Sequence, residues 1–216
     1  MKLEGLYLIA DTAQLIEDNM EKHIASLIEA GVSMIQFRNK THCTNEHDAV
    51  RAHDLAKTMQ AQCRIYNIPF IVNDDVSLAI AINADGVHLG KDDMDIQKAR
   101  QRLGPNKHIG MSCYASASRA LQAQQNGADY VAFGAVFKST TKPQAKPLGS
   151  STEESLRVLK ELSMGVNIPI CAIGGITPDK TKQVLRCGVQ IVAVASGVLK
   201  AGNSYQAVEN YCRAWL

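Results

Sequence analysis

The sequence has no long apolar run and no excess of charge of one sign. Its 216 residues include 23 Lys and Arg against 21 Asp and Glu, and no basic block is present. This balance gives no sign of a nucleic-acid-binding surface, and we expect no nucleic-acid partner. No apolar run reaches the ~18 residues of a transmembrane helix. The opening stretch MKLEGLYLIAD meets acidic residues too early for a signal peptide, so we expect no membrane partner.

The cysteines lack any pattern that would bind a metal. Six cysteines are scattered without a CxxC pair or a cysteine–histidine zinc spacing. Cys113 and Cys171 lie in apolar runs, where cysteine packs as a small hydrophobic residue. We therefore expect reduced, structural thiols in a cytoplasmic protein and no cysteine nucleophile. The histidines show no ligand pattern either, and we expect His88 in the core or the barrel interior.

Eight short apolar runs are present, at residues 6–10, 34–37, 69–72, 86–89, 108–113, 130–136, 169–173 and 191–196. They are continuously apolar, as in parallel strands buried on both faces. Helical spacing appears between them, for example at Ile16, Met20, Ile24 and Leu27. Eightfold strand–helix alternation predicts the α/β class, with residues 1–216 forming a single (β/α)8 TIM barrel. An open doubly wound sheet is the alternative, but the GxGxxG turn that would support it is missing.

Carboxylates follow the third and fourth predicted strands. The run 69–72 is followed by Asn73 and then by Asp74, and the run 86–89 is followed a few residues later by Asp93. Since the loops after the strands share one end of a barrel, both carboxylates can reach one small volume. Mg2+ is typically held by one or two carboxylates together with phosphate oxygens. The pattern alone supports a magnesium site and a pair of helix caps equally.

Basic residues are expected at the same end of the barrel. Arg38 and Lys40 share one face of an extended chain with Gln36, directly after an apolar strand, and Lys142 lies in the loop after the sixth strand. Such cations, facing carboxylates across a loop cluster, favour a magnesium-bound diphosphate.

A second anion site is predicted after the last two strands. Gly174 and Gly175 allow a ligand to approach the backbone closely. The stretch 195–197 begins a short helix, and free N–H groups at a helix start favour an anion. Tight packing is the alternative explanation for the glycines. Two anion sites at one barrel mouth would suit two phosphorylated substrates.

The motifs QFRNK, FIVNDD, NADGVHLGKDD, IGMSCY, GADYVAFGAVF, STTKP, AIGGI and VAVASGV occur in this order. On these motifs the chain resembles the thiamine-phosphate synthase family, from near its first residue to about Leu199. The resemblance implies a (β/α)8 barrel that joins 4-amino-2-methyl-5-hydroxymethylpyrimidine diphosphate to a thiazole phosphate, with release of diphosphate. It implies Mg2+ as the cofactor.

The resemblance also implies roles for individual residues. Lys142, Ser112 and Arg38 would be catalytic, and Asp74 and Asp93 would hold Mg2+. The pyrimidine diphosphate would contact Gln36, Phe37, Arg38, Asn39, Lys40, Asn73, Ser112 and Lys142. The thiazole phosphate would contact Ser139, Thr140, Thr141, Gly175, Ala195 and Ser196.

Three positions depart from the family pattern, namely Asn39, Lys91 and Ser139. Two other functions stay open: a thiazole phosphate tautomerase of the same fold, and an inactive ligand-binding or regulatory barrel. The intact set of diphosphate residues favours the synthase. The sequence does not fix the oligomeric state, and a homodimer is one candidate.

Overall fold

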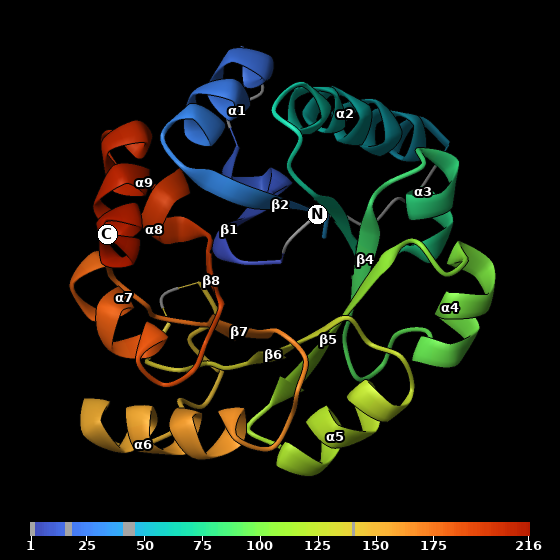
Figure 1. Cartoon of the computed structure of the whole chain (residues 1–216). Helices are drawn as coiled ribbons and strands as arrows, with labels where there is room; N and C mark the ends of the chain where they lie inside the picture. Colours follow the sequence, from blue (N-terminus) through green and yellow to red (C-terminus); the bar gives the residue numbers. More distant parts are fainter. Residues whose placement is uncertain (1–2, 16–18, 41–45, 140) are drawn as a thin grey trace.

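The computed structural model describes residues 3–15, 19–40, 46–139 and 141–216. Eight parallel strands pair in chain order and close into one barrel, and helices surround it (Figure 1). The predicted single (β/α)8 barrel is therefore confirmed. In the described part of the chain, every helix is too short or too polar to cross a membrane.

The strands are β1 Gly5–Asp11, β2 Val32–Arg38, β3 Phe70–Asn73, β4 Gly86–Leu89, β5 His108–Tyr114, β6 Tyr130–Phe133, β7 Ile170–Ile173 and β8 Ile191–Val194. The α-helices are α1 Met20–Glu29, α2 Glu46–Ile65, α3 Val76–Ala81, α4 Ile96–Leu103, α5 Ala117–Gln125, α6 Thr152–Ser163, α7 Pro178–Leu185, α8 Ser196–Leu199 and α9 Ser204–Cys212. Two short 3-10 helices, η1 Thr12–Gln14 and η2 Arg213–Trp215, complete the described elements.

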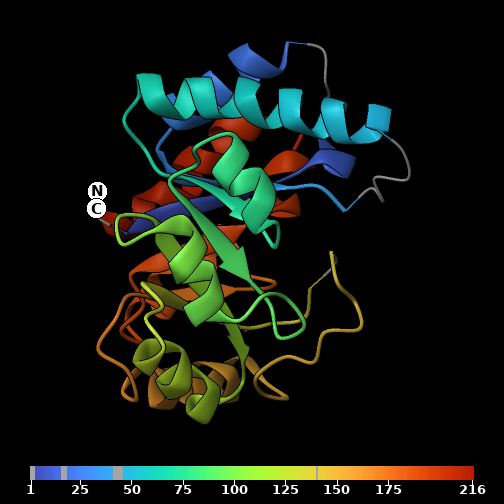
Figure 2. The same cartoon turned by 90° about the vertical axis from the view of Figure 1, so that its right-hand side faces the viewer.

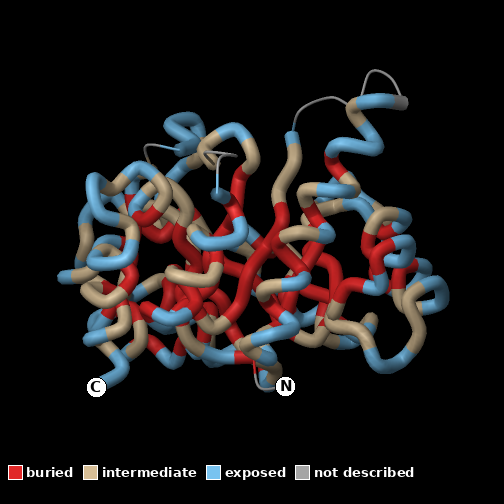
Figure 3. The backbone as a smooth tube through the Cα atoms, turned by 90° about the horizontal axis from the view of Figure 1, so that it is seen from above, coloured by how far each residue is buried: buried red, intermediate tan, exposed pale blue. Residues whose placement is uncertain are grey.

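The strands are buried on both faces because they separate two apolar cores. On β1, Leu6 and Leu8 point outward into the core between barrel and helices, while Tyr7 and Ile9 point into the barrel interior. Buried segments accordingly lie at the centre and exposed ones at the periphery (Figure 3). This arrangement explains why the strands read as continuous apolar runs.

The predicted strand boundaries lie within two residues of the observed ones, except at the end of β6. The runs 130–136 and 191–196 extend past the observed ends of β6 at Phe133 and of β8 at Val194. Beyond β6 the chain still bonds to the end of β7, because Val136 N donates to the Ile173 carbonyl oxygen at 2.9 Å. On α1 the predicted face is buried, whereas Ile16 lies outside the described residues.

The two ends of the barrel carry different parts of the chain. Figure 2 shows both termini at one end and the long loop between β6 and α6 at the other. The loops that follow the strands gather at this second end, which is where barrels of this type place their active sites.

Candidate active site

A cavity of about 370 Å³ opens at the end of the barrel where the strands finish. Its walls come from β1, β2, β3, β4, β5, β6, β7 and β8 and from the loops that follow them. Ten of the residues predicted for the site line it: Gln36, Arg38, Asn73, Ser112, Ser139, Thr141, Lys142, Gly175, Ala195 and Ser196. The volume is within the range of small-molecule sites, roughly 300–1,000 Å³.

Arg38 is held in place by a carboxylate of the neighbouring strand. Asp11 and Arg38 are register partners on β1 and β2, and the Arg38 guanidinium donates to the Asp11 carboxylate. Asp11 is only 5% exposed, and it also caps η1 by accepting from Ala13 N at 3.2 Å. A buried, anchored carboxylate therefore orients the arginine at the cavity wall.

Asp74 and Asp93 lie together in the loops after β3 and β4, and neither lines the cavity, although Asn73 at the end of β3 does. The Lys40 ammonium donates to Asp74, and the carboxyl group of Asp93 lies close to that of Asp74. Burial opposes ionisation of Asp74, but the contacts with Lys40 and Asp93 hold its pKa below the ordinary value. Burial and the Asp74 carboxylate raise the pKa of Asp93.

Neither carboxylate caps a helix, so the cap alternative is wrong. The cap of α3 is Asp75, whose side chain accepts from Leu78 N at 2.9 Å. The cap of α4 is Asp95, not Asp93. Instead, Asp93 accepts from Gly90 N at 2.6 Å, a contact that folds the loop after β4 back on itself.

The donor set at Asp74 and Asp93 suits a hard cation. In the described residues no cluster of three or more His, Cys, Asp or Glu side chains could hold a metal ion. Two neighbouring carboxylates are nevertheless sufficient for Mg2+, which takes its remaining ligands from water and phosphate. A bound cation would offset the repulsion between the two carboxylates, so the residues fit the group.

Lys142 adds a third cation to this end of the cavity. Partial desolvation lowers its pKa, and the positive charges of Arg38 and Lys40 lower it further, against the opposing effect of Asp74. No carboxylate in the described part of the chain forms an ion pair with it. An anion that binds here would therefore relieve repulsion among three cations.

Ser112 lies at the boundary between this charged end and the barrel interior. Its Oγ is 2.9 Å from Nε2 of His88, an imidazole that is only 8% exposed. Burial lowers the pKa of His88 to about 4, so the ring is neutral at physiological pH. His88 lies in the barrel interior, as predicted, but nothing in the sequence indicated that it lines the site.

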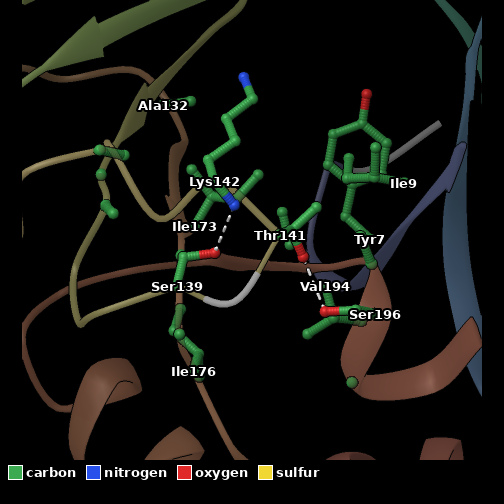
Figure 4. Close-up of a pocket in the computed structure, with 18 of the residues that line it drawn as sticks. Tyr7, Ile9, Ala132, Ser139, Thr141, Lys142, Ile173, Ile176, Val194 and Ser196 are labelled. Carbon is green, nitrogen blue, oxygen red and sulfur yellow. Dashed lines mark hydrogen bonds between the residues drawn. The ribbon is translucent and has the colours of Figure 1, made fainter. Parts of the chain in front are cut away.

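Hydroxyl groups mark the other end of the cavity. Thr141 Oγ1 and Ser196 Oγ lie 2.7 Å apart, and Ser139 Oγ accepts from Lys142 N at 3.4 Å. Figure 4 shows the Lys142 amino group pointing away from these hydroxyls. The cavity thus has a cationic end and a hydroxyl-lined end. The helix predicted to begin at this second end is α8, which starts at Ser196 and has only four residues.

Gly175 lets the backbone come close to the hydroxyl end. Its φ is +63°, and a Cβ there would lie 2.3 Å from the Lys138 carbonyl oxygen. Any side chain would therefore push the loop after β6 away from its place. The structure therefore shows tight packing at this glycine, and its close approach to a ligand stays a prediction.

Three residues predicted to contact substrate do not line the cavity. Phe37 is 1% exposed and packs in the core between barrel and helices, where its ring lies 6.4 Å from that of Phe70. Asn39 accepts from Thr12 Oγ1 at 3.0 Å, a contact between the loops after β1 and β2. Lys40 forms an ion pair with Asp74 instead, and Thr140 lies outside the described residues.

The described cysteines are free thiols, as predicted. Four of them are buried, and burial raises the pKa of Cys63 and of Cys113 to about 12. Cys171 lines the cavity, and burial raises its pKa as well, so it is not a nucleophile. Cys43 lies outside the described residues.

This chain is similar to known proteins in both sequence and structure. Residues 6–198 match the family model described as thiamine monophosphate synthase. A thiamine-phosphate synthase from Nitrosococcus oceani is 42% identical over 209 residues, which cover 97% of this chain and 91% of that protein. A thiamine-phosphate synthase from Clostridium acetobutylicum is 38% identical over 91% of this chain and 87% of its own length.

A solved structure agrees with these sequences. The thiamine phosphate pyrophosphorylase from Pyrococcus furiosus superposes with a TM-score of 0.82 at 35% identity, and the match covers 97% of this chain and 94% of that one. The similarity extends over the whole barrel and includes every strand that contributes to the cavity.

Proposed function

The chain belongs to the thiamine monophosphate synthase family, and on that premise we propose that it joins a hydroxymethylpyrimidine diphosphate to a thiazole phosphate and releases diphosphate. It is an enzyme of the transferase class, as its relatives are. The observation that carries the assignment of substrates is the polarity of the cavity. Three cations and the carboxylates of Asp11, Asp74 and Asp93 gather at one end, and hydroxyl groups at the other.

The cationic end suits the leaving diphosphate. Arg38, Lys40, Lys142 and the Ser112 hydroxyl can each donate to its oxygens as negative charge develops on them. Donors fixed in advance stabilise such charge without reorganisation during the reaction. Asp11 contributes indirectly, because it holds the guanidinium of Arg38 in place.

Asp74 and Asp93 would hold Mg2+, and the ion when bound would share the charge of the diphosphate oxygens. Lys40 forms an ion pair with Asp74 before the substrate arrives. The hydroxyl end, with Thr141, Ser196 and the backbone at Gly175, suits the thiazole phosphate.

The reaction needs no protein nucleophile. The bond between the pyrimidine methylene carbon and the diphosphate oxygen breaks, and its electron pair leaves with the diphosphate. The resulting cation is stabilised by the pyrimidine ring, and the lone pair of the thiazole nitrogen then forms the new carbon–nitrogen bond. The buried thiols and the neutral His88 are consistent with this route, in which positioning and charge supply the rate.

Product analysis tests the proposal. The purified chain is incubated with both substrates, with and without Mg2+, and thiamine phosphate and diphosphate are quantified separately. We expect equal amounts of both products, and only with the metal. Conversion of the thiazole phosphate without diphosphate release would instead indicate a tautomerase, and binding without conversion a regulatory barrel. A homodimer and a cytoplasmic location stay predictions from the sequence.

A further inference from the structure

A chain of hydrogen-bonded side chains crosses the barrel interior, and every member except Tyr130 lines the cavity. The Gln36 amide Nε2 donates to the Tyr7 hydroxyl at 2.8 Å, and the hydroxyl oxygens of Tyr7 and Tyr130 lie 3.1 Å apart. His88 Nδ1 is 2.9 Å from the Tyr130 hydroxyl, and His88 Nε2 is 2.9 Å from Ser112 Oγ. The chain therefore links one side chain of the cavity wall, Gln36, to another, Ser112.

Apart from Ser112, the members of this chain are almost fully buried. Tyr130 has no exposed surface, Tyr7 is 1% exposed and Gln36 is 4% exposed. Leaving a buried hydroxyl without an acceptor is costly, so each O–H in the chain must donate to its neighbour. Tyr130 contributes nothing to the cavity wall, so it can influence a ligand only through the groups that it contacts.

The positions of the protons follow from counting donors and acceptors along the chain. The Tyr7 oxygen accepts from Gln36, so the Tyr7 O–H donates to Tyr130. The Tyr130 O–H then donates to Nδ1 of His88. Because a neutral imidazole carries one N–H, that hydrogen is on Nε2 and donates to Ser112 Oγ. The Ser112 O–H is left over, at the cavity wall.

We propose that Tyr130 is a positioning residue, which holds His88 in its Nε2–H tautomer and so keeps the Ser112 hydroxyl as a donor toward an anion in the cavity. In the opposite order Ser112 would donate to His88 and present only lone pairs to that anion. The tautomer is independent of the reaction, whereas the benefit to a diphosphate rests on the proposed function.

The tautomer of His88 is measured by NMR on protein with 15N-labelled histidine rings, and the His88→Gln variant assigns the signal. We expect the Nε2–H tautomer in the unsubstituted protein at neutral pH. Tyr130→Phe should lower its population. Tyr66→Phe is the matched control, since the Tyr66 hydroxyl bonds to Glu29 on the surface, and it should change nothing.

A ring protonated at Nδ1, or at both nitrogens, in the unsubstituted protein would overturn the proposal, whether or not any variant folds. An unchanged tautomer in a folded Tyr130→Phe variant would overturn the role of Tyr130.

Kinetics test the consequence for the reaction. Tyr130→Phe should lower kcat/KM for the diphosphate substrate roughly five- to tenfold and leave KM for the thiazole phosphate unchanged. In a Ser112→Ala background it should cost nothing more, because Tyr130 acts through Ser112. Independent, multiplicative losses would overturn this link. If the unsubstituted chain forms no product, the proposed function fails while the NMR result still decides the proton order.

Discussion

Replacing Lys142 separates the contribution of its charge to catalysis from its contribution to folding. Lys142 lies exposed at the cavity mouth, and two neighbouring cations lower its pKa. Lys142→Met removes one charge-assisted contact to the diphosphate, which is worth about 1.5–3 kcal/mol. The expected fall in kcat/KM is roughly ten- to 150-fold, at 1.36 kcal/mol per tenfold.

The same substitution should not weaken the fold. The pKa of Lys142 in the folded chain is below its ordinary value of 10.5, so carrying the charge costs stability at every pH below the folded pKa. That cost disappears as pH rises toward 10.5, the ordinary value. Lys142→Met should therefore keep or raise the free energy of unfolding at neutral pH, measured by urea denaturation.

The pH profile identifies the charge directly. As pH rises through the lowered pKa of Lys142, the side chain loses its proton. The alkaline decline in kcat/KM should therefore begin before the pH reaches 10.5, the ordinary pKa of lysine. Lys142→Arg should shift this alkaline decline to higher pH, because arginine keeps its charge. Lys146→Met, in the same loop but outside the cavity wall, is the control. A profile that is identical for lysine and arginine, or near-normal turnover of the Met variant, would refute the reasoning.

Three further predictions follow from particular contacts. Asp74→Asn and Asp93→Asn should each raise the Mg2+ concentration for half-maximal activity, and the double variant should cost less than the sum of the two; superimposable Mg2+ titrations would contradict a shared ion. Without Mg2+ these changes should alter the unfolding free energy by less than about 1 kcal/mol. Gly175→Ala would place a Cβ 2.3 Å from a main-chain oxygen, so it should destabilise the fold by about 1–3 kcal/mol and raise KM for the thiazole phosphate. Gly165→Ala is the control, because the nearest atom to its Cβ lies at 3.4 Å, and it should have neither effect. Equal melting temperatures of the two variants would refute this prediction. Cys63→Ser should lower the unfolding free energy by about 1–3 kcal/mol with unchanged turnover per folded molecule, since the thiol is buried and has no catalytic role; inactivation by a thiol reagent without unfolding would count against that reading.

The alternation of side chains along a strand explains which site residues the sequence could place. Gln36 and Arg38 are two residues apart, so both point into the barrel once β2 is identified. By the same rule Phe37 points outward, and the structure places it there. The family resemblance names all three residues together, but only strand geometry separates the wall from the core.

Contacts between distant strands could not be read from the sequence. Asp11 meets Arg38 only because β1 and β2 pair in one particular register. Tyr7 and Tyr130, 123 residues apart, meet across the barrel interior. Helix caps were ambiguous for a different reason, because Asp75 and Asp95 stand close to the carboxylates in question and perform the capping instead.

A crystal structure of the protein with Mn2+ and diphosphate tests the central claim most directly, because the anomalous signal of the metal locates it independently. The account predicts the metal between the carboxylates of Asp74 and Asp93, with the diphosphate against Lys142 and Ser112. Diphosphate beside the hydroxyls of Thr141 and Ser196, or a metal bound away from both carboxylates, would contradict it.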